Sequence, residues 1–230
     1  MGHGVSSGLS GGGAGATKIP LPSGGYIDLT GSPLIYGGND PNVDKKSRKE
    51  VTAFERAHRD ERKREYGILI DKDGKVIAEE VGTNGHLVWK NTPYSTFVKA
   101  NIMLHNHNRQ DLGILGATFS VRDIQNHVLY NRPIDGAIAK EGTYFISNRQ
   151  NFNGSALVDA YSSFHRKSSI RRTKDFDRLE ARWNAGEITK VEYYAGQDRL
   201  NNEHFIRLHN FLLDNQSRYG YNYTLERRKK

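Results

Sequence analysis

The chain has 230 residues, enough for one domain with extensions or for two small domains, and enough to bury a sizeable core. It contains no cysteine, which excludes disulfide frameworks, iron–sulfur clusters, cysteine-rich zinc ribbons and thiol catalysis, so any zinc must be held by histidine and carboxylate groups. The formal net charge of +8 permits binding to nucleic acid or to an acidic partner, but the excess is not gathered in one block. No apolar run of bilayer length and no signal peptide stands out, so we expect a soluble cytoplasmic protein without a membrane address.

The N-terminal part of the chain is predicted to carry little regular structure before one charged helix. Residues 1–17 are mostly Gly, Ser and Ala with almost nothing to bury, which predicts a flexible linker. Residues 18–64 follow, with prolines and glycine pairs that allow short extended pieces over 26–29 and 34–36, wrapped on the domain surface. The last part, 44–64, is densely charged with a narrow apolar stripe at helical spacing, which predicts a solvated helix rather than a nucleic-acid site.

Residues 65–152 are predicted to form a compact α/β domain. Two apolar runs meet at Asp73-Gly74, and this dipeptide is a strong signal for a hairpin, here over 65–81. The further expected elements are a strand over 86–89, a helix over 94–100, a strand from Ile102, a helix over 120–130 and a second hairpin over 134–146. Alternating strands and helices predict a mixed sheet flanked by helices.

Residues 153–230 are predicted to form a helical C-terminal extension with a basic tail. Apolar residues recur at helical spacing from Ser155 onward, and Gly186 marks a break between two helices. The tail, 219–230, interleaves tyrosines with basic residues, a pattern that can stack on nucleic-acid bases but is more often a docked segment with a solvated end. We expect the extension to be an appendage to an independently folded domain.

Residues 101–123 carry the candidate chemistry. An apolar run leads into His105 and His107, and because side chains on a strand alternate between faces, both imidazoles point the same way. Ser120 and Asp123 follow at the start of a predicted helix, where the carboxylate of Asp123 can meet the histidines as a third ligand. The pattern predicts a zinc site with one open position.

Each half of this pattern also has a simpler explanation. Ser120-x-x-Asp123 is close to a capping box, which would stabilise the helix without any metal. His105 and His107 could equally be loop or core histidines. The two halves together favour the metal site. The adjacent letters His-Asn-His are not the signature of an HNH nuclease, whose residues are dispersed over a hairpin and a helix.

The roles in a hydrolytic reaction follow from the ligands. Zinc held by two neutral imidazoles and a carboxylate leaves its fourth position to a water whose pKa falls to about 7. A second carboxylate must then take the proton of that water, and a hydroxyl should steady the oxyanion. The reaction class would be hydrolysis. Glu79 and Glu80, on a neighbouring predicted strand, are rival candidates for the base.

The chain resembles the JAB/JAMM (MPN+) zinc metalloprotease family, most closely its RadC-like prokaryotic and phage branch. The family pattern is a Glu opening a hairpin, His-x-His-Pro at the end of a later strand, and Ser-x-x-Asp on a helix. Glu65, His105-Asn-His107 and Ser120-Val-Arg-Asp123 match it. The resemblance implies a JAB/cytidine-deaminase-like sheet, zinc bound by His105, His107 and Asp123, Glu65 as general base and Ser120 as oxyanion donor.

The resemblance covers residues 65–147 and departs from the family pattern in one loop. Asn108 stands where the family has proline, and the loop 108–119 is longer than the family's. We expect this loop to arch over the site and shape substrate access, because closing a few extra residues costs little entropy. Asp111 within it is expected to be solvated rather than a ligand.

These observations predict a Zn²⁺-dependent metallopeptidase or isopeptidase, a hydrolase of phage or prophage type that acts on a protein or peptide substrate in the cytoplasm or in association with a virion. Two alternatives stay open. The positive charge and basic tail would suit a nucleic-acid-binding protein or a nuclease, although no dense basic stripe or recognition motif is present. A metal-free JAB-like scaffold would keep the fold without the chemistry.

Overall fold

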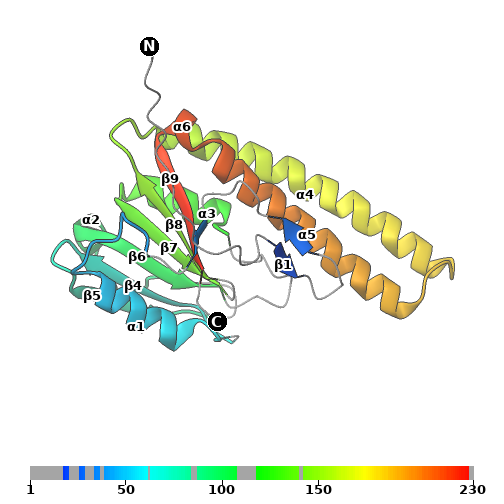
Figure 1. Cartoon of the computed structure of the whole chain (residues 1–230), viewed down its shortest axis with the longest axis horizontal. Coiled ribbons are helices and arrows are strands. Elements are labelled where there is room, and N and C mark those ends of the chain that lie inside the picture. Colours follow the sequence, from blue (N-terminus) through cyan, green and yellow to red (C-terminus); the bar gives the residue numbers. More distant parts are fainter. Residues whose placement is uncertain are drawn as a thin grey trace, which may run out of the picture.

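The fold is mixed α+β, with helices on both faces of a mixed sheet (Figure 1). This computed structural model describes residues 18–20, 26–28, 34–36, 39–61, 63–83, 87–107, 118–139 and 142–227. The strands of the main sheet are β3 (Leu34–Tyr36), β4 (Tyr66–Asp71), β5 (Val76–Val81), β6 (Ala100–Asn106), β7 (Ile134–Ile138), β8 (Gly142–Asn148) and β9 (Tyr221–Arg227). The helices are α1 (Arg48–His58), α2 (Tyr94–Lys99), α3 (Val121–Leu129), α4 (Gly154–Asn184), α5 (Lys190–Asp214) and α6 (Gln216–Tyr219). The predicted fold class is confirmed.

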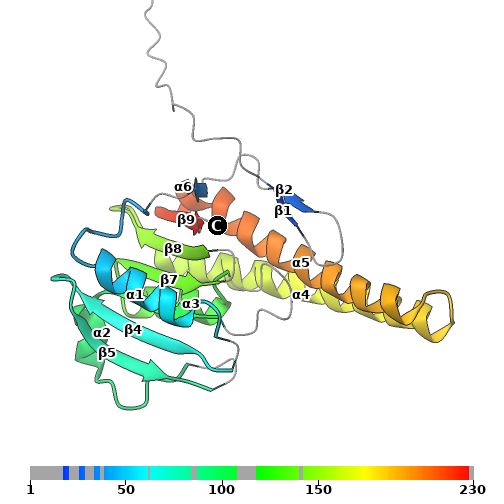
Figure 2. The same cartoon turned by 60° about the horizontal axis from the view of Figure 1, so that its bottom comes forward.

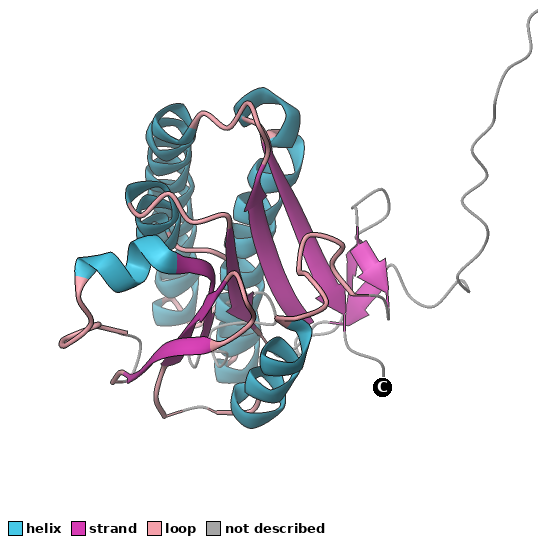
Figure 3. Ribbon diagram, turned by 90° about the vertical axis from the view of Figure 1, so that its left-hand side faces the viewer, coloured by secondary structure: helices cyan, strands magenta, loops and turns pink. Residues whose placement is uncertain are grey.

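Seven strands of the described chain form the main sheet in the order β3-β9-β8-β7-β6-β4-β5. Figure 3 shows the strands with helices packed beside them. The pairs β6/β7 and β3/β9 are parallel, and the other neighbours are antiparallel. A separate two-stranded sheet pairs β1 (Lys18–Pro20) with β2 (Tyr26–Asp28). The predicted extended pieces are confirmed as β2 and β3, and β3 belongs to the edge of the main sheet.

Buried apolar side chains form a core on each face of the sheet. In Figure 2, α1 and the α4/α5 hairpin lie on different sides of the sheet. On one face, Val51 and Phe54 of α1 pack over Ile102 and Leu104 of β6. On the other face, α3, α4 and α5 contribute to a second core that also includes side chains of β7, β8 and β9. The strand β6 contributes Ile102 and Leu104 to the first core, while Met103, on its other face, belongs to a smaller cluster with Leu69 and Phe97.

The β4/β5 hairpin forms at the predicted turn. Gly74 has a φ of +79°, a conformation that residues with a Cβ rarely adopt. The carboxylate of Asp71 accepts hydrogen bonds from the backbone N–H groups of Asp73 and Lys75, at 2.9 Å each. These contacts explain why the Asp-Gly signal was sufficient to predict the hairpin.

The strand predicted over 86–89 is wrong for the residues described there, because Leu87–Trp89 has no regular structure. The side chains of Leu87 and Trp89 instead lie against Gly67 of β4, where an added Cβ would come within 2.4 Å of Leu87 Cδ2. The missing side chain of Gly67 leaves the room that this segment occupies. The segment 87–89 is therefore held against β4 by side-chain packing and not by strand pairing.

The C-terminal region forms a long helical hairpin and then returns to the sheet. Gly186, with a φ of +72°, lies between α4 and α5, as the predicted break requires. The segment read as a basic tail contains β9, which pairs with β8 on one side and β3 on the other. No helix in the described part of the chain is long and apolar enough to span a membrane.

The predicted division at residues 152/153 does not separate two structural units. Leu157 of α4, Leu212 of α5 and Tyr223 of β9 belong to the same core as Ile124 of α3 and Ala137 of β7. The second half of the chain therefore completes the domain. The sequence-based boundary failed because helical periodicity does not show which sheet the apolar face of a helix covers.

We expect the hairpin and the sheet to unfold as one unit. In a Trp183→Phe background, fluorescence reports on Trp89 alone, which lies beside β4. Leu212→Ala removes a fully buried side chain from the shared core and should lower the free energy of unfolding seen by Trp89 by about 2–5 kcal/mol. Leu129→Ala, at an exposed position, is the matched control and should change it by less than about 0.5 kcal/mol. An unchanged Trp89 transition in Leu212→Ala would show two independent units.

Candidate metal centre

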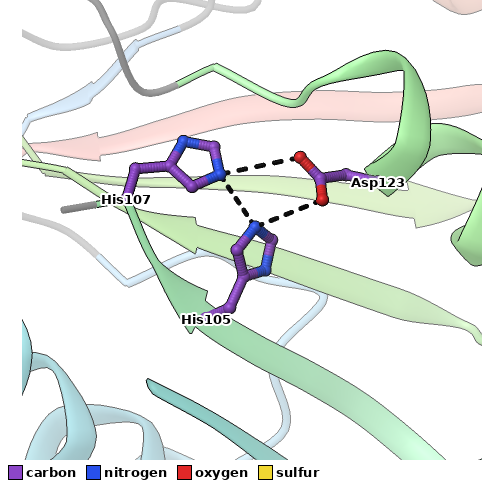
Figure 4. A group of neighbouring side chains, drawn as sticks. All are labelled: His105, His107 and Asp123. Atoms are coloured by element: carbon purple, nitrogen blue, oxygen red, sulfur yellow. Dashed lines mark hydrogen bonds and ion pairs between the residues drawn. The ribbon is translucent and has the colours of Figure 1, made fainter. Parts of the chain in front are cut away.

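The end of β6 presents two histidines to the face of the sheet that carries α3 (Figure 4). His105 and His107 are separated by one residue, so strand alternation turns both rings to the same side. Their Nε2 atoms lie 2.8 Å apart. The backbone N–H of His107 donates to Ile138 O of β7 at 3.0 Å, which holds the end of the strand in position.

Asp123 reaches these histidines from the first turn of α3. Ser120 is the N-cap: its hydroxyl accepts from the N–H of Asp123 at 3.2 Å, and its own N–H donates to Asp123 Oδ2 at 2.7 Å. The carboxylate also lies 3.5 Å from His105 Nε2 through Oδ1 and 3.6 Å from His107 Nε2 through Oδ2. The capping box and the candidate ligand set therefore coexist, since the same carboxylate takes part in both.

The spacing of the three donor groups suits a small divalent cation. Metal–ligand distances of about 2.0–2.1 Å and tetrahedral angles require ligand atoms roughly 3.3 Å apart. The separations of 3.5 and 3.6 Å match this value, and the 2.8 Å between the imidazoles is shorter by a shift that two side-chain torsions can supply. In the part of the chain that the structure describes, His105, His107 and Asp123 are the group that could hold a metal ion.

The charges of these side chains are coupled. Burial alone would raise the pKa of Asp123, but His105 and His107 outweigh it and hold that pKa well below its usual range. Burial alone would lower the pKa of His105, but the charge of Asp123 outweighs it and raises that pKa. The carboxylate is therefore ionised, which suits a cation, while a bound cation must compete with the proton on His105.

All of the predicted site residues line one cavity of about 420 Å³. Ser120 lies at its wall beside Asp123, and Glu65 lies one residue before β4. Gly67 pairs with His105 in the β4/β6 ladder, so Glu65 stands two residues further along, on the same face of the sheet. The carboxylate of Glu65 is close enough to contribute to the raised pKa of His105.

The sequence analysis missed the role of Asn106, the residue between the two histidines. Its side chain is fully buried and points to the opposite face. Oδ1 accepts from the N–H of Tyr66 at 2.5 Å, and Nδ2 donates to the carbonyl of Arg64 at 3.2 Å. These contacts bracket Glu65 on both sides. Asn106 therefore ties the segment that carries Glu65 to the strand that carries the histidines.

The helical hairpin supplies another wall of the cavity. Tyr161 of α4 donates from its hydroxyl to the carbonyl of Phe119, the residue before the N-cap, at 2.6 Å. His165 of α4 and Phe205 and Leu208 of α5 line the cavity. No local signal in the sequence could have found these residues, because they reach the site only through tertiary packing.

The rival bases lie on opposite faces of β5. Glu79 pairs with Ile68 and lies beside the second, smaller cavity of about 240 Å³, which α1 covers. Glu80 pairs with Gly67, which also pairs with His105, so Glu80 lies on the face of the sheet that carries the histidines. The carboxylate of Glu80 accepts from the backbone N–H of Lys90 at 3.3 Å. Asp111 and most of the predicted access loop, 108–117, lie outside the described residues.

Comparison of the chain with protein-family models, with curated proteins and with solved structures finds no match in any of the three.

Loss of the Asn106 carboxamide should destabilise the strand end beside Glu65. Asn106→Ala leaves the N–H of Tyr66 and the carbonyl of Arg64 without these part-buried hydrogen bonds, at an expected cost of about 1–3 kcal/mol in the free energy of unfolding. Asn91→Ala, at an exposed position, is the matched control with a change below about 0.5 kcal/mol. Urea unfolding measures both, and hydrogen exchange at the Tyr66 amide should accelerate only in Asn106→Ala. Equal stability of the two variants would contradict the role of Asn106.

Proposed function

We propose that this protein is a zinc-dependent hydrolase of amide bonds, a metallopeptidase or isopeptidase that acts on a protein or peptide substrate. One observation carries the proposal. Two imidazole nitrogens, an ionised carboxylate, a second glutamate and a helix-capping hydroxyl converge on a single cavity. This combination provides metal ligands, a base that need not bind the metal, and a hydrogen-bond donor.

Each side chain has a distinct role in this proposal. His105, His107 and Asp123 hold the metal ion, which when bound acts as a Lewis acid and lowers the pKa of water to about 7. Glu65 accepts a proton from the attacking water and delivers it to the leaving amine. The hydroxyl of Ser120 accepts from the N–H of Asp123, so its own proton is available to the oxyanion of the substrate.

The resemblance to the JAB/JAMM pattern supports an amide as the bond that is cleaved. It rests on Glu65, the pair His105 and His107, and the pair Ser120 and Asp123. The geometry adds support from outside the motif, since Asn106 holds the Glu65 segment beside the histidines. The RadC-like character also supports a phage or prophage origin, with the protein acting in the cytoplasm or in association with a virion.

Zinc binding is the first expectation to test. Equilibrium dialysis of metal-free protein should give one zinc per chain, and His107→Ala should lose it because a ligand is removed. Affinity should fall as the pH is lowered through the pKa of His105, which is raised above its ordinary value of 6.5, because protons and metal compete for the same nitrogen. Equal zinc content in wild type and His107→Ala would overturn the ligand assignment. No zinc in either would support the metal-free scaffold instead.

Glu65→Gln should separate catalysis from metal binding. Glutamine keeps the size of the side chain but cannot accept a proton, so zinc content should be retained while the cleavage rate falls by roughly 10²-fold to 10⁴-fold. Digestion of a complex peptide library, read by mass spectrometry, supplies the assay without a known substrate. Glu79→Gln is the matched control and should cleave like wild type, because Glu79 pairs with Ile68 and lies on the face of the sheet that α1 covers. Loss of cleavage in Glu80→Gln alone would transfer the role of base to that residue.

A further inference from the structure

The seam between α4 and α5 is apolar at both ends and basic in the middle. Near the sheet, Leu157 and Leu212 belong to the shared core. Further out, Leu179 packs against Gly196 so closely that an added Cβ would come within 2.7 Å of Leu179 Cδ1. The residues that face one another between these apolar ends are His165, Ser168, Arg172, Asn201, His204 and Arg207. Polar and basic side chains in the middle of an otherwise apolar helix–helix contact require a physical explanation.

Hydrogen bonds order the middle of the seam. Arg207 Nε donates to Ser168 Oγ at 2.9 Å, and Ser168 Oγ lies 2.9 Å from His204 Nδ1. Burial, followed by the charge of Arg172, lowers the pKa of His204 to about 3, so its imidazole is neutral and can accept the hydroxyl proton of Ser168. The chain of bonds holds the guanidinium of Arg207 in one orientation.

The positive charges in this stretch have no ion-pair partner among the described residues. Arg172 and Arg207 are both half-buried, and Arg172 donates a hydrogen bond of 3.5 Å to Asn201 Oδ1. The acidic side chains that act on Arg207 at longer range, Glu203 and Asp175, already lie in ion pairs with other arginines. Half-burying two cations without an ion-pair partner costs free energy.

We propose that Arg172 and Arg207, together with His165, bind an oxyanion, a phosphate or carboxylate group carried by a ligand that enters the main cavity. His165 joins the two regions: it lines the cavity, and its ring lies 5.4 Å from that of His204 in an edge contact. Guanidinium groups match phosphate and carboxylate because their N–H donors form a planar fork. The subsite contains none of the proposed metal ligands, so anion binding can be tested independently of zinc binding and hydrolysis.

Thermal unfolding of the full chain without zinc tests the subsite. Sodium phosphate and sodium acetate are compared with sodium chloride at equal ionic strength, so that general screening is the same in every arm. An anion that binds the folded state at roughly ten times its Kd should raise the Tm by about 3–6 °C. A rise with phosphate alone assigns a phosphate group to the ligand, and a rise with acetate assigns a carboxylate.

Arg172→Gln should lose this rise in Tm and should fold normally, because the hydrogen bond that the side chain makes within the described residues is the long one to Asn201. Arg207→Gln should lose it as well, at some cost to the Ser168 network. Arg166→Gln removes the same charge from an exposed position of α4 and should keep the full rise. The proposal is overturned if neither anion raises the Tm of the wild type, or if Arg172→Gln responds as the wild type does.

Discussion

The alternation of side chains along β6 is the constraint on which the rest of the structure depends. Ile102 and Leu104 fill the core beneath α1, while His105 and His107 emerge on the opposite face. A register shift of one residue would exchange the two sets and would put imidazoles into an apolar core. The strand is paired on both edges, antiparallel to β4 and parallel to β7, so this register is doubly specified. Asn106 lies between the two histidines, so its side chain points to the opposite face of the sheet. There it forms hydrogen bonds to the residues on both sides of Glu65 instead of apolar contacts.

The orientation of α3 is the second condition for the site. A capping box requires the carboxylate of Asp123 to fold back toward the N-terminus of the helix, and this is the direction in which the histidines lie. The other end of α3 is anchored by Arg132, which donates two hydrogen bonds of 2.6 Å to the buried carboxylate of Asp135 in β7. Arg132 holds the pKa of Asp135 below its usual range in spite of burial, so the pair stays charged. A buried ion pair adds little net stability, but breaking it is costly, and it therefore fixes where the helix sits relative to the sheet.

The site was predictable where short-range geometry determines it. Period-two alternation turns His105 and His107 to one side, and the three-residue spacing of a capping box directs Asp123. Each of these two features could be predicted from a few neighbouring residues. That the histidines and Asp123 come together in space was an inference. The placement of β9 was missed although Tyr221, Tyr223 and Leu225 alternate with polar residues, because the basic residues that follow suggested a tail. The hydrogen bonds of Asn106 and the cavity wall formed by His165 and Phe205 join segments that are distant in sequence. No periodicity encodes such contacts, since they depend on which faces meet after the sheet has formed.

The helical hairpin shows how stability and binding can be divided along one element. Its base is tied to the sheet by Leu157, Tyr161 and Leu212, which are fully buried in a core shared with α3 and β9. Hydrophobic burial there is large enough to hold both helices in place, so the next turns need not contribute apolar contacts. Those turns carry the half-buried Arg172 and Arg207 and begin at His165, which lines the cavity. The anion that we propose would offset their positive charge. Beyond them the seam becomes apolar again at Leu179, which keeps the helices together on the far side. The apolar contacts on both sides fix the two helices that carry the basic stretch, and a binding site that is formed before its ligand arrives lowers the entropic cost of binding.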